Sequence, residues 1–453
     1  MLRFSAIGSA CKGNPALKNI ISFVVLLCVC FTSVVHAALL NIDPHTVEAE
    51  AWTILDPQSG QVIAESNSHV QRAPASLTKM MVAYITLKEI QAGHLNKAEI
   101  LTATPVVNMV QWDESQMYLK PGQQISIDQL LTGLVVMSAN DAAVSLAERI
   151  AGTVPKFIER MNQEAQALGM TDTHFSNAPG ISMDDHYSTA HDLSLLGQAL
   201  VTQTPDYLFY SKQQSFSYNQ HFHHATNILL KQDPSVDGLK TGFTKAAGFN
   251  LALTASRSTS NTDSTAVANR RLIVVVLGTK SGVKRAEVAH KLMNLAYSYT
   301  RDEIAIKDKQ LLAELPVVKS TLKMFKVESK QPKYMTTALY DSKALINLAQ
   351  FDNTTQRLVL PDADGLLNPV EPLQQTNTHL NIKLSTQSLT APLATMMQLA
   401  TVQVYQNDML IQTIDIEDDV QLEQANWLQR LLAWFSQLFG SDQSNKAKIY
   451  PLG

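Results

Sequence analysis

The feature that most constrains the fold is a change of hydrophobic period along residues 51–300. Through the middle of this stretch, apolar residues recur every three or four positions, which is typical of helices buried on one face. At both ends the pattern changes to short runs rich in β-branched residues, which favour strands. Strands at the two ends of a domain with helices between them predict an α+β fold. The predicted helices are 76–92, 126–137, 141–151 and 287–300, and the predicted strands are 51–55, 61–64, 249–255 and 271–278.

Turn and capping residues mark the ends of these elements. Pro57-Gln58-Ser59-Gly60 predicts a hairpin turn between the first two strands. Ser126 followed by Gln129 forms a capping-box pattern, and Gly93 and Gly152 end two of the helices. Residues 256–269 are rich in Ser, Thr and Asn, and predict a polar hairpin loop between the last two strands.

The chain is long enough for more than one folded unit. Short alternating runs separated by turns such as Gln406-Asn407-Asp408 predict a small all-β domain over residues 304–416, after a first domain over 38–303. The remaining residues, 417–453, contain one wide apolar stripe on a predicted helix. Such a tail suits binding in the plane of a membrane surface. The pattern alone equally allows a helix packed on protein. The stripe consists of Trp427, Leu428, Leu431, Leu432, Trp434, Phe435, Leu438 and Phe439.

The N-terminus predicts export. Basic residues precede an apolar run over 20–35, and Val35-His36-Ala37 has the small-residue spacing of a cleavage site, so residues 1–37 are expected to be a signal peptide. All three cysteines, Cys11, Cys28 and Cys30, lie in this segment. The exported chain would therefore contain no disulfide, thiolate nucleophile or cysteine-ligated metal.

Charge and histidine patterns exclude other classes. With 36 basic and 40 acidic residues, the formal charge of −4 gives no basic excess, so no nucleic-acid partner is expected. His221, His223 and His224 cluster without an acidic partner at metal-binding spacing, and are interpreted as part of a polar loop. No phosphate-binding loop or dinucleotide fingerprint occurs, so neither a cofactor nor a metal is expected.

Three short motifs occur in order along the first domain. They are Ser76-Leu77-Thr78-Lys79, Ser138-Ala139-Asn140 and Lys240-Thr241-Gly242. The first two are weak alone, because Ser-x-x-Lys recurs elsewhere, for example at Ser320, and any one of these residues could simply cap a helix or lie on the surface. Their order and settings carry the weight. Only Ser76 opens a strong helix after Ala73-Pro74-Ala75, Ser138 lies between two helices, and Lys240 lies on a strand beside a glycine.

Each motif can supply one part of a nucleophilic site. Lys79 lies one helical turn after Ser76, so its amine can face the serine hydroxyl. Burial beside a second cation, Lys240, would lower the Lys79 pKa and provide a neutral amine as general base. We expect Ser138 to relay a proton and Asn140 to bond the substrate amide and orient Lys79.

The third motif supplies the substrate-binding part. We expect Lys240 and Thr241 to offer a charge and a hydroxyl to a carboxylate. Gly242 would keep the strand edge open for an extended peptide. The backbone N–H groups of Ser76 and Phe243 form the expected oxyanion pair.

These motifs resemble those of the low-molecular-mass penicillin-binding proteins of the serine D-alanyl-D-alanine carboxypeptidase class. The resemblance is supported by stretches at 161–162, 168–170, 173–177, 186–190 and 236–242. It implies a β-lactamase/transpeptidase-like catalytic domain followed by a β domain and a membrane-anchoring tail. It also implies catalytic roles for Ser76, Lys79 and Ser138, and substrate-binding roles for Asn140, Lys240 and Thr241. Arg271 resembles a position that helps to hold the substrate carboxylate.

The implied reaction removes the terminal D-alanine from peptidoglycan stem peptides through an acyl-enzyme on Ser76. β-Lactam antibiotics such as penicillins would acylate the same serine. The implied location is the periplasmic face of the bacterial inner membrane, where the C-terminal helix would bind the membrane surface.

The chain departs from the family pattern at two places. Phe243 replaces a frequent histidine after Lys-Thr-Gly, and the 256–269 loop is long. Three alternatives stay open: a class A-like β-lactamase, a catalytically weak wall-binding scaffold and a transpeptidase. The sequence has no Glu-x-x-Leu-Asn after the second motif to deacylate a penicillin, which argues against the first.

Overall fold

The computed structural model describes residues 38–258, 269–429 and 446–452. The predicted signal peptide therefore lies outside the described residues. So do residues 259–268 of the predicted loop and residues 430–445 of the predicted amphipathic helix. Of the apolar stripe only Trp427 and Leu428 are described, and they are 70% and 49% exposed.

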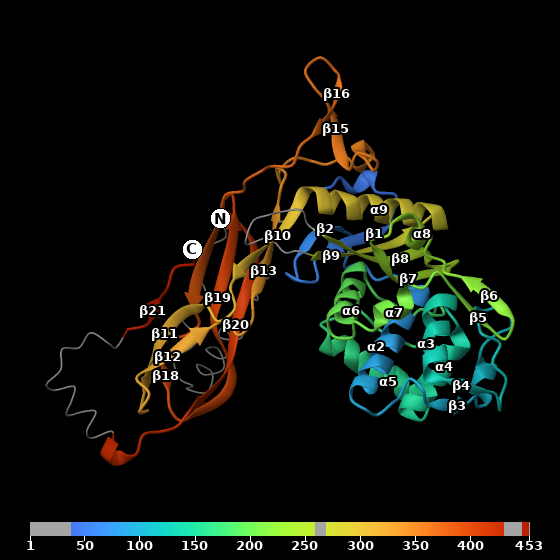
Figure 1. Cartoon of the computed structure of the whole chain (residues 1–453), viewed down its shortest axis with the longest axis horizontal. Coiled ribbons are helices and arrows are strands. Elements are labelled where there is room, and N and C mark those ends of the chain that lie inside the picture. The colour runs from blue at the N-terminus through green and yellow to red at the C-terminus, as the bar shows by residue number, and fades with distance from the viewer. Residues whose placement is uncertain (1–37, 259–268, 430–445, 453) are drawn as a thin grey trace, which may run out of the picture. The chain divides into compact units, whose positions relative to one another are not determined.

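A five-stranded antiparallel sheet forms the frame of the first part of the chain (Figure 1). One edge strand, β7 (Val236–Thr244), carries Lys240 and Thr241. The strand at the opposite edge is β2 (Val62–Ser66). The predicted α+β class is confirmed. In spatial order the strands are β2 (Val62–Ser66), β1 (Ala51–Leu55), β9 (Asn269–Thr279), β8 (Gly248–Ser258) and β7 (Val236–Thr244).

The central strand β9 is buried on both faces, and its alternate side chains enter two different cores. One set, Leu272, Val274 and Val276, joins residues of helix α9 (Gly282–Tyr299). Ile273 and Val275 face the helical layer that contains α2 (Lys79–Gln91) and α6 (Ala190–Thr202). Figure 1 shows α9 on one side of the sheet and α2 and α6 on the other. The buried middle strand explains why its sequence is continuously apolar rather than alternating.

The helices follow the predicted periodic stretches with some shifts of their ends. The capping box at Ser126 and Gln129 is present, and Thr189 caps α6 through the Asp192 N–H. The predicted helix at 287–300 begins earlier, at Gly282, because the Ser281 hydroxyl accepts from the Lys284 N–H. The helices are α2 (Lys79–Gln91), α3 (Ile127–Thr132), α4 (Asn140–Ala151), α5 (Val154–Ala167), α6 (Ala190–Thr202), α7 (Tyr207–Ser211), α8 (Leu229–Gln232) and α9 (Gly282–Tyr299).

Shorter elements connect these helices. The predicted helix 126–137 changes after Thr132 into a π turn, Gly133–Met137, so it is not one regular helix. Two small antiparallel strand pairs, which the sequence analysis did not predict, are formed by β3 with β4 and by β5 with β6, and only the second is a short hairpin. The remaining elements here are η1 (Pro44–Thr46), η2 (Ala75–Thr78), η3 (Pro105–Met109), β3 (Ile100–Thr102), β4 (Gln124–Ser126), β5 (Ser215–Tyr218) and β6 (His221–His224).

The C-terminal region is rich in β-strands, as predicted. Its longest feature is the hairpin of β19 and β20, which turns at Asn407 and Asp408 with positive φ angles of 49° and 64°. The strands are β10 (Thr300–Ile306), β11 (Leu311–Val318), β12 (Met324–Glu328), β13 (Lys333–Ala338), β14 (Phe351–Asp352), β15 (Arg357–Pro361), β16 (Leu367–Val370), β17 (Thr378–Leu384), β18 (Leu389–Thr390), β19 (Leu393–Gln406), β20 (Met409–Leu422) and β21 (Lys448–Ile449), with a short helix η5 (Leu348–Gln350).

Two strands cross the boundaries that the sequence analysis placed around this region. Strand β10 follows helix α9 directly and spans the predicted boundary after residue 303, because no linker separates Tyr299 from Thr300. Strand β20 continues to Leu422, beyond the predicted boundary after Ile416, and pairs there with Leu393 of β19.

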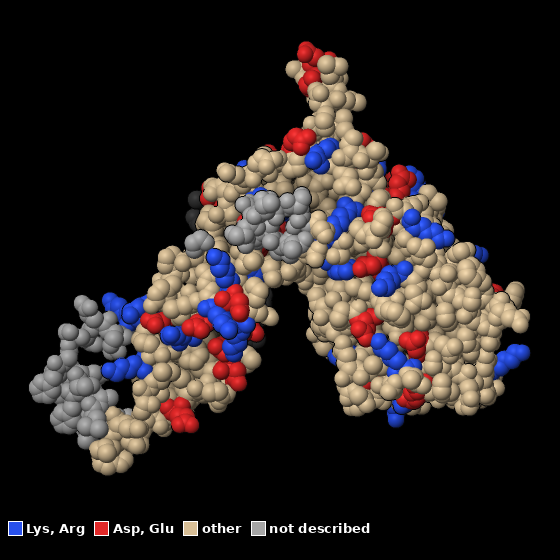
Figure 2. All heavy atoms as spheres, in the orientation of Figure 1, with Lys and Arg blue, Asp and Glu red and all other residues tan. Residues whose placement is uncertain are grey.

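Charges of both signs are interspersed on the described part of the face in Figure 2, in keeping with the nearly balanced charge of the chain. Among the described residues, no helix has the length and apolar content needed to cross a membrane.

Candidate active site

The first motif folds into a tight turn at the start of α2. Ser76 lies in the 3-10 turn η2, so the regular α-helix begins at Lys79 rather than at Ser76. Ala75 has a positive φ of 52°, and the Thr78 hydroxyl donates to its carbonyl oxygen at 2.8 Å. A strained backbone held by side-chain bonds is common where a residue must be presented in one fixed position.

Lys79 is buried against Ser76. Its side chain is 1% exposed, and its Nζ atom donates to the Ser76 Oγ at 3.1 Å and to the carbonyl oxygen of Pro179 at 2.6 Å. Burial, with the charge of Lys240 as a second cause, lowers the Lys79 pKa well below its ordinary value. Among the described residues no carboxylate forms an ion pair with Lys79, and the more distant charges of Glu114 and Asp141 only partly offset the lowering of its pKa.

A buried histidine connects this turn to the segment that contains Pro179. The His186 Nδ1 accepts a hydrogen bond from the Ser176 N–H at 3.0 Å. A neutral imidazole ring therefore carries its proton on Nε2, which lies 2.8 Å from the Thr78 Oγ. Burial lowers the pKa of His186 to about 4, so the ring is neutral near pH 7. The sequence analysis used residues 186–190 only in support of the family resemblance and gave His186 no role of its own.

The second motif lies between the π turn and α4. Ser138 adopts a left-handed conformation with φ 58°, and Asn140 is the first residue of α4. The Asn140 side chain donates to Glu114 at 2.5 Å, and no hydrogen bond among the described residues joins it to Lys79. The predicted orienting role for Asn140 is thus taken in this structure by Ser76 and Pro179. Glu114 was not anticipated.

A buried aspartate holds the Glu114 segment in place. Asp141 is 1% exposed and accepts from the backbone N–H groups of Met117 at 2.9 Å and Leu119 at 3.0 Å. A carboxylate that bonds several N–H groups of a neighbouring segment fixes that segment to the helix.

The third motif lies on the edge strand β7. Lys240 is 3% exposed, and its Nζ donates to the Thr241 carbonyl oxygen at 3.0 Å. Burial, followed by the charge of Arg285, lowers the Lys240 pKa to about 7. Gly242 approaches the first motif closely, since a Cβ there would lie 3.1 Å from the Ser76 nitrogen. This contact explains the glycine by its packing against the turn that contains Ser76, which the sequence analysis did not foresee.

Two arginines lie near β7, and the sequence analysis assigned a role in holding the substrate carboxylate to only one of them, Arg271. Arg271 forms a bidentate pair with Asp237, at 2.6 and 2.8 Å, near the start of β7. Arg285, on α9, is 8% exposed and donates to the Gly242 carbonyl oxygen at 3.3 Å and to the Thr226 carbonyl oxygen at 3.1 Å. The Thr226 hydroxyl in turn bonds that of Thr241. Arg285 is therefore the arginine that adjoins Lys-Thr-Gly.

An exposed aromatic pair lies just after the third motif. Phe243 is 51% exposed, and its ring lies 4.3 Å from that of Phe249, centroid to centroid. The neighbouring Thr244 bonds Ser182 across to the segment after Pro179.

A family model described as D-alanyl-D-alanine carboxypeptidase, peptidase S11, matches residues 38–281 of this chain. The chain belongs to this family. It is a serine D-alanyl-D-alanine carboxypeptidase related to the low-molecular-mass penicillin-binding proteins, as the motif resemblance predicted.

Individual relatives in the peptidase S11 family support this assignment. The chain is 35% identical over 301 residues to D-alanyl-D-alanine carboxypeptidase DacA of Escherichia coli K12, covering 64% of this chain and 72% of the relative. It is 34% identical over 282 residues to DacC of the same strain, covering 61% and 68%.

Solved structures of relatives extend the likeness into the β-rich region. Penicillin-binding protein 5 of Haemophilus influenzae has a TM-score of 0.67 at 25% identity, covering 84% of this chain and all of that one. Penicillin-binding protein 6B of E. coli has a TM-score of 0.58 at 26% identity, covering 84% and 99%. The predicted transpeptidase-like fold with an additional β-rich region is confirmed.

Proposed function

We propose that Ser76 is the nucleophile of this carboxypeptidase and that neutral Lys79 is its general base. The observation that carries the proposal is the 3.1 Å separation between the Lys79 Nζ and the Ser76 Oγ inside a buried site that lowers the lysine pKa. A buried amine without an ionic partner is favoured in its neutral form, and only that form can accept the serine proton.

In the acylation step, Ser76 Oγ bonds to the carbonyl carbon of the penultimate D-alanine while its proton passes to Lys79. The bond to the terminal D-alanine nitrogen then breaks, and a proton returns to that leaving amine. Water later adds to the Ser76 ester, releasing the shortened peptide and restoring the serine hydroxyl. Ser138 is proposed to relay the proton to the leaving amine, and the N–H groups of Ser76 and Phe243 to stabilise the oxyanion.

The substrate-binding part of the proposal assigns the terminal carboxylate to β7. Lys240 supplies a positive charge and Thr241 supplies a hydroxyl to bind this carboxylate. Arg285, on helix α9, supplies a second positive charge. Support comes from the position of Arg285 against Gly242 and from its effect on the Lys240 pKa. Asn140 is proposed to bond the substrate amide, which requires its amide group to leave Glu114.

The substrates follow from the family activity. Stem peptides of peptidoglycan that end in D-alanyl-D-alanine are the proposed natural substrates. β-Lactam antibiotics are proposed to acylate Ser76, because their strained amide also places a carboxylate near the reacting carbonyl. The β-lactamase alternative predicts rapid loss of the bound drug, whereas a carboxypeptidase keeps its penicilloyl ester for much longer.

The location is a separate proposal. We place the enzyme at the periplasmic face of the inner membrane, on the basis of the signal-peptide pattern in residues 1–37 and the apolar stripe in the tail. Fractionation of cells that produce the full chain and a chain ending before residue 423 tests it. Loss of membrane association in the shorter chain alone is expected, and equal association of both would contradict the role of the tail.

The decisive experiment measures D-alanine release from a peptide that ends in D-alanyl-D-alanine. We expect release by the parent and none by Ser76→Ala. Ser320→Ala is the matched control, because Ser320 also begins a Ser-x-x-Lys sequence but lies in the β-rich region, where its Oγ accepts from the Leu322 N–H. Covalent penicillin binding without D-alanine release by a folded parent would instead favour a transpeptidase or a scaffold.

A further inference from the structure

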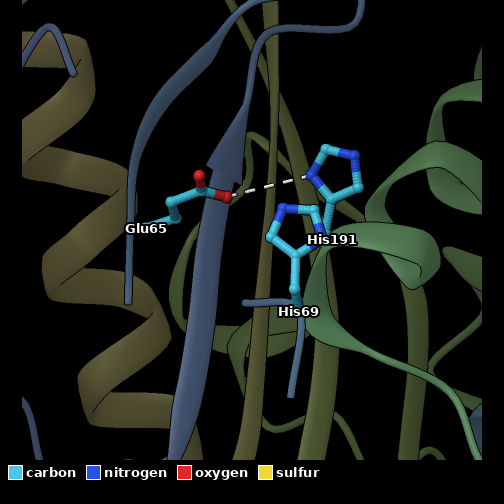
Figure 3. A group of neighbouring side chains, drawn as sticks. All are labelled: Glu65, His69 and His191. Atoms are coloured by element: carbon cyan, nitrogen blue, oxygen red, sulfur yellow. Dashed lines mark ion pairs between the residues drawn. The ribbon is translucent and has the colours of Figure 1, made fainter. Parts of the chain in front are cut away.

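A cluster of two imidazoles and a carboxylate lies outside the candidate active site. Glu65 is on strand β2, His69 is in the segment that leads to Ser76, and His191 is in the first turn of helix α6 (Figure 3). One possible ligand atom from each lies within 4.8 Å of the others. Figure 3 shows the Glu65 carboxylate facing a nitrogen of His191, with the His69 ring lying beside that of His191 at a centroid distance of 4.4 Å.

The separation between Glu65 and His191 does not suit a hydrogen bond. The His191 Nδ1 lies 3.8 Å from the Glu65 Oε2, and this buried nitrogen has no hydrogen-bond partner among the described residues. Two ligands of a tetrahedral zinc ion, each bonded at about 2.0–2.1 Å, are about 3.3–3.4 Å apart. The two atoms would need to approach each other by about half an ångström to bind one such ion, and the unpartnered nitrogen is available to do so.

A second carboxylate, that of Asp172, lies next to His69. The Asp172 Oδ2 lies 3.6 Å from the His69 Nδ1, again too far for a hydrogen bond. Two imidazoles and a carboxylate match the ligand preferences of Zn²⁺ and similar divalent transition metals. The mixed donor set separates this cluster from the acidic patches that occur on many surfaces.

The backbone holds the parts of the cluster in register before any ion binds. The His191 N–H donates to the Ser68 carbonyl oxygen at 3.0 Å. Arg72 and Ser188 exchange two backbone bonds, at 2.8 and 3.0 Å. The segments that carry His69 and His191 are thus already joined, so binding would need only side-chain rotation. His69 is 58% exposed at its side chain and Glu65 35%, which leaves both free to rotate by the roughly 1 Å required.

We propose that Glu65, His69 and His191 form a binding site for a divalent transition metal of the zinc class, with the Asp172 carboxylate next to His69. The bound ion would join β2 and the segment before Ser76 to helix α6. It would act as a structural clamp beside the catalytic domain's nucleophile turn, since His69 precedes Ser76 by only seven residues. This departs from the sequence analysis, which expected no metal, because residues 65–69 and 191 are far apart in the chain.

The test measures Zn²⁺ binding to the full chain by titration calorimetry after removal of metals with a chelator. Three proteins are compared: the parent, the double variant His69→Ala/His191→Ala, and the control His221→Ala/His223→Ala, which loses two imidazoles from one face of strand β6. Zinc bound elsewhere, including at the N-terminal cysteines, is common to all three and cancels. We expect the parent and the control to bind one more Zn²⁺ than the double variant, or to bind it about 10- to 100-fold more tightly.

Two further measurements make the result specific. Thermal unfolding should shift upward with Zn²⁺ in the parent and the control but not in the double variant, because only binding to the folded state stabilises it. Co²⁺ should give the intense visible absorption of a tetrahedral complex in the same two proteins. If the double variant does not fold without metal, Glu65→Gln, which keeps the side-chain shape, takes its place. Equal Zn²⁺ binding by all three proteins, or its loss in the control, would overturn the proposal.

Discussion

Gly180 lies so close to Ala75 that a Cβ atom at position 180 would be 2.1 Å from the Ala75 carbonyl oxygen. This glycine also has a positive φ of 88°. The residue before it, Pro179, offers its carbonyl oxygen to Lys79. The approach of Gly180 to the nucleophile turn therefore brings the lysine acceptor and Ser76 into one site.

Gly180→Ala should move the Ser76 turn and destabilise the fold. The strained φ and the clash with Ala75 together should lower the free energy of unfolding by about 2–4 kcal/mol. Gly93→Ala is the matched control, because Gly93 has a similar φ of 77° but nothing within 4 Å of a Cβ. Chemical denaturation and penicillin acylation rates check both. Equal effects in the two variants would show that the clash is unimportant.

Lys79→Arg should abolish most of the activity without removing the positive charge. An arginine cannot become neutral in this pH range, so it cannot accept the Ser76 proton. Acylation by penicillin should fall by about 100- to 10,000-fold, as for loss of a general base. In the parent, the acylation rate should fall only when the pH drops below the lowered Lys79 pKa. Substantial acylation by a folded Lys79→Arg protein would contradict the assignment.

Loss of the Lys240 charge should reduce the activity of the enzyme at alkaline pH. Its pKa of about 7 in the free protein means that its charge is present below pH 7 and is lost as the pH rises through that value. For a substrate with a terminal carboxylate, kcat/KM should therefore decline above about pH 7, since this ratio reports ionisations of the free enzyme. Lys240→Arg keeps its charge, so its profile should lack this decline whatever its absolute rate. An unchanged alkaline limb would assign the decline to another group.

Replacement by glutamine should have different effects at Arg285 and at Arg271. Arg285→Gln should reduce kcat/KM by about 10- to 100-fold, the effect of losing one charged hydrogen-bonding group near the substrate carboxylate. Arg271→Gln should mainly lower the melting temperature, because it leaves Asp237 without its bidentate partner. Arg285→Lys should restore part of the activity if charge is what matters. A large loss of kcat/KM in Arg271→Gln, with little loss in Arg285→Gln, would instead assign the substrate carboxylate to Arg271.

His186 should make the fold sensitive to acid. Its pKa is about 4 when folded and about 6.5 when unfolded, so the unfolded chain binds the proton more readily. The stabilisation is complete above about pH 6.5 and is lost as the pH falls toward about 4, by up to about 3 kcal/mol. Denaturation of the parent and His186→Asn across this range isolates the effect, since other titrating groups are shared. Parallel stability curves for the two proteins would contradict it.

The identity of the elements and of the motif residues was accessible from sequence because both depend on neighbours in the chain. Helical periodicity around Ser76 and Lys79 needs only local spacing, and the β-rich character of β7 to β9 needs only composition. The order of the three motifs was enough to indicate the family. The predicted positions of helix ends were less accurate. For example, the start of α9 at Gly282 was missed, because capping by Ser281 depends on one hydrogen bond.

Only the tertiary structure decided which groups surround those residues. The partner of Lys79 at Pro179, the contact of Gly180 with Ala75, and the choice of Arg285 over Arg271 each join positions far apart in sequence. Such contacts are set by how loops, strands and helices pack against one another, which the neighbours of a residue in the chain do not determine. The pKa of Lys79 follows the same rule, because the sequence determines that an amine is present, while burial determines whether it carries a charge.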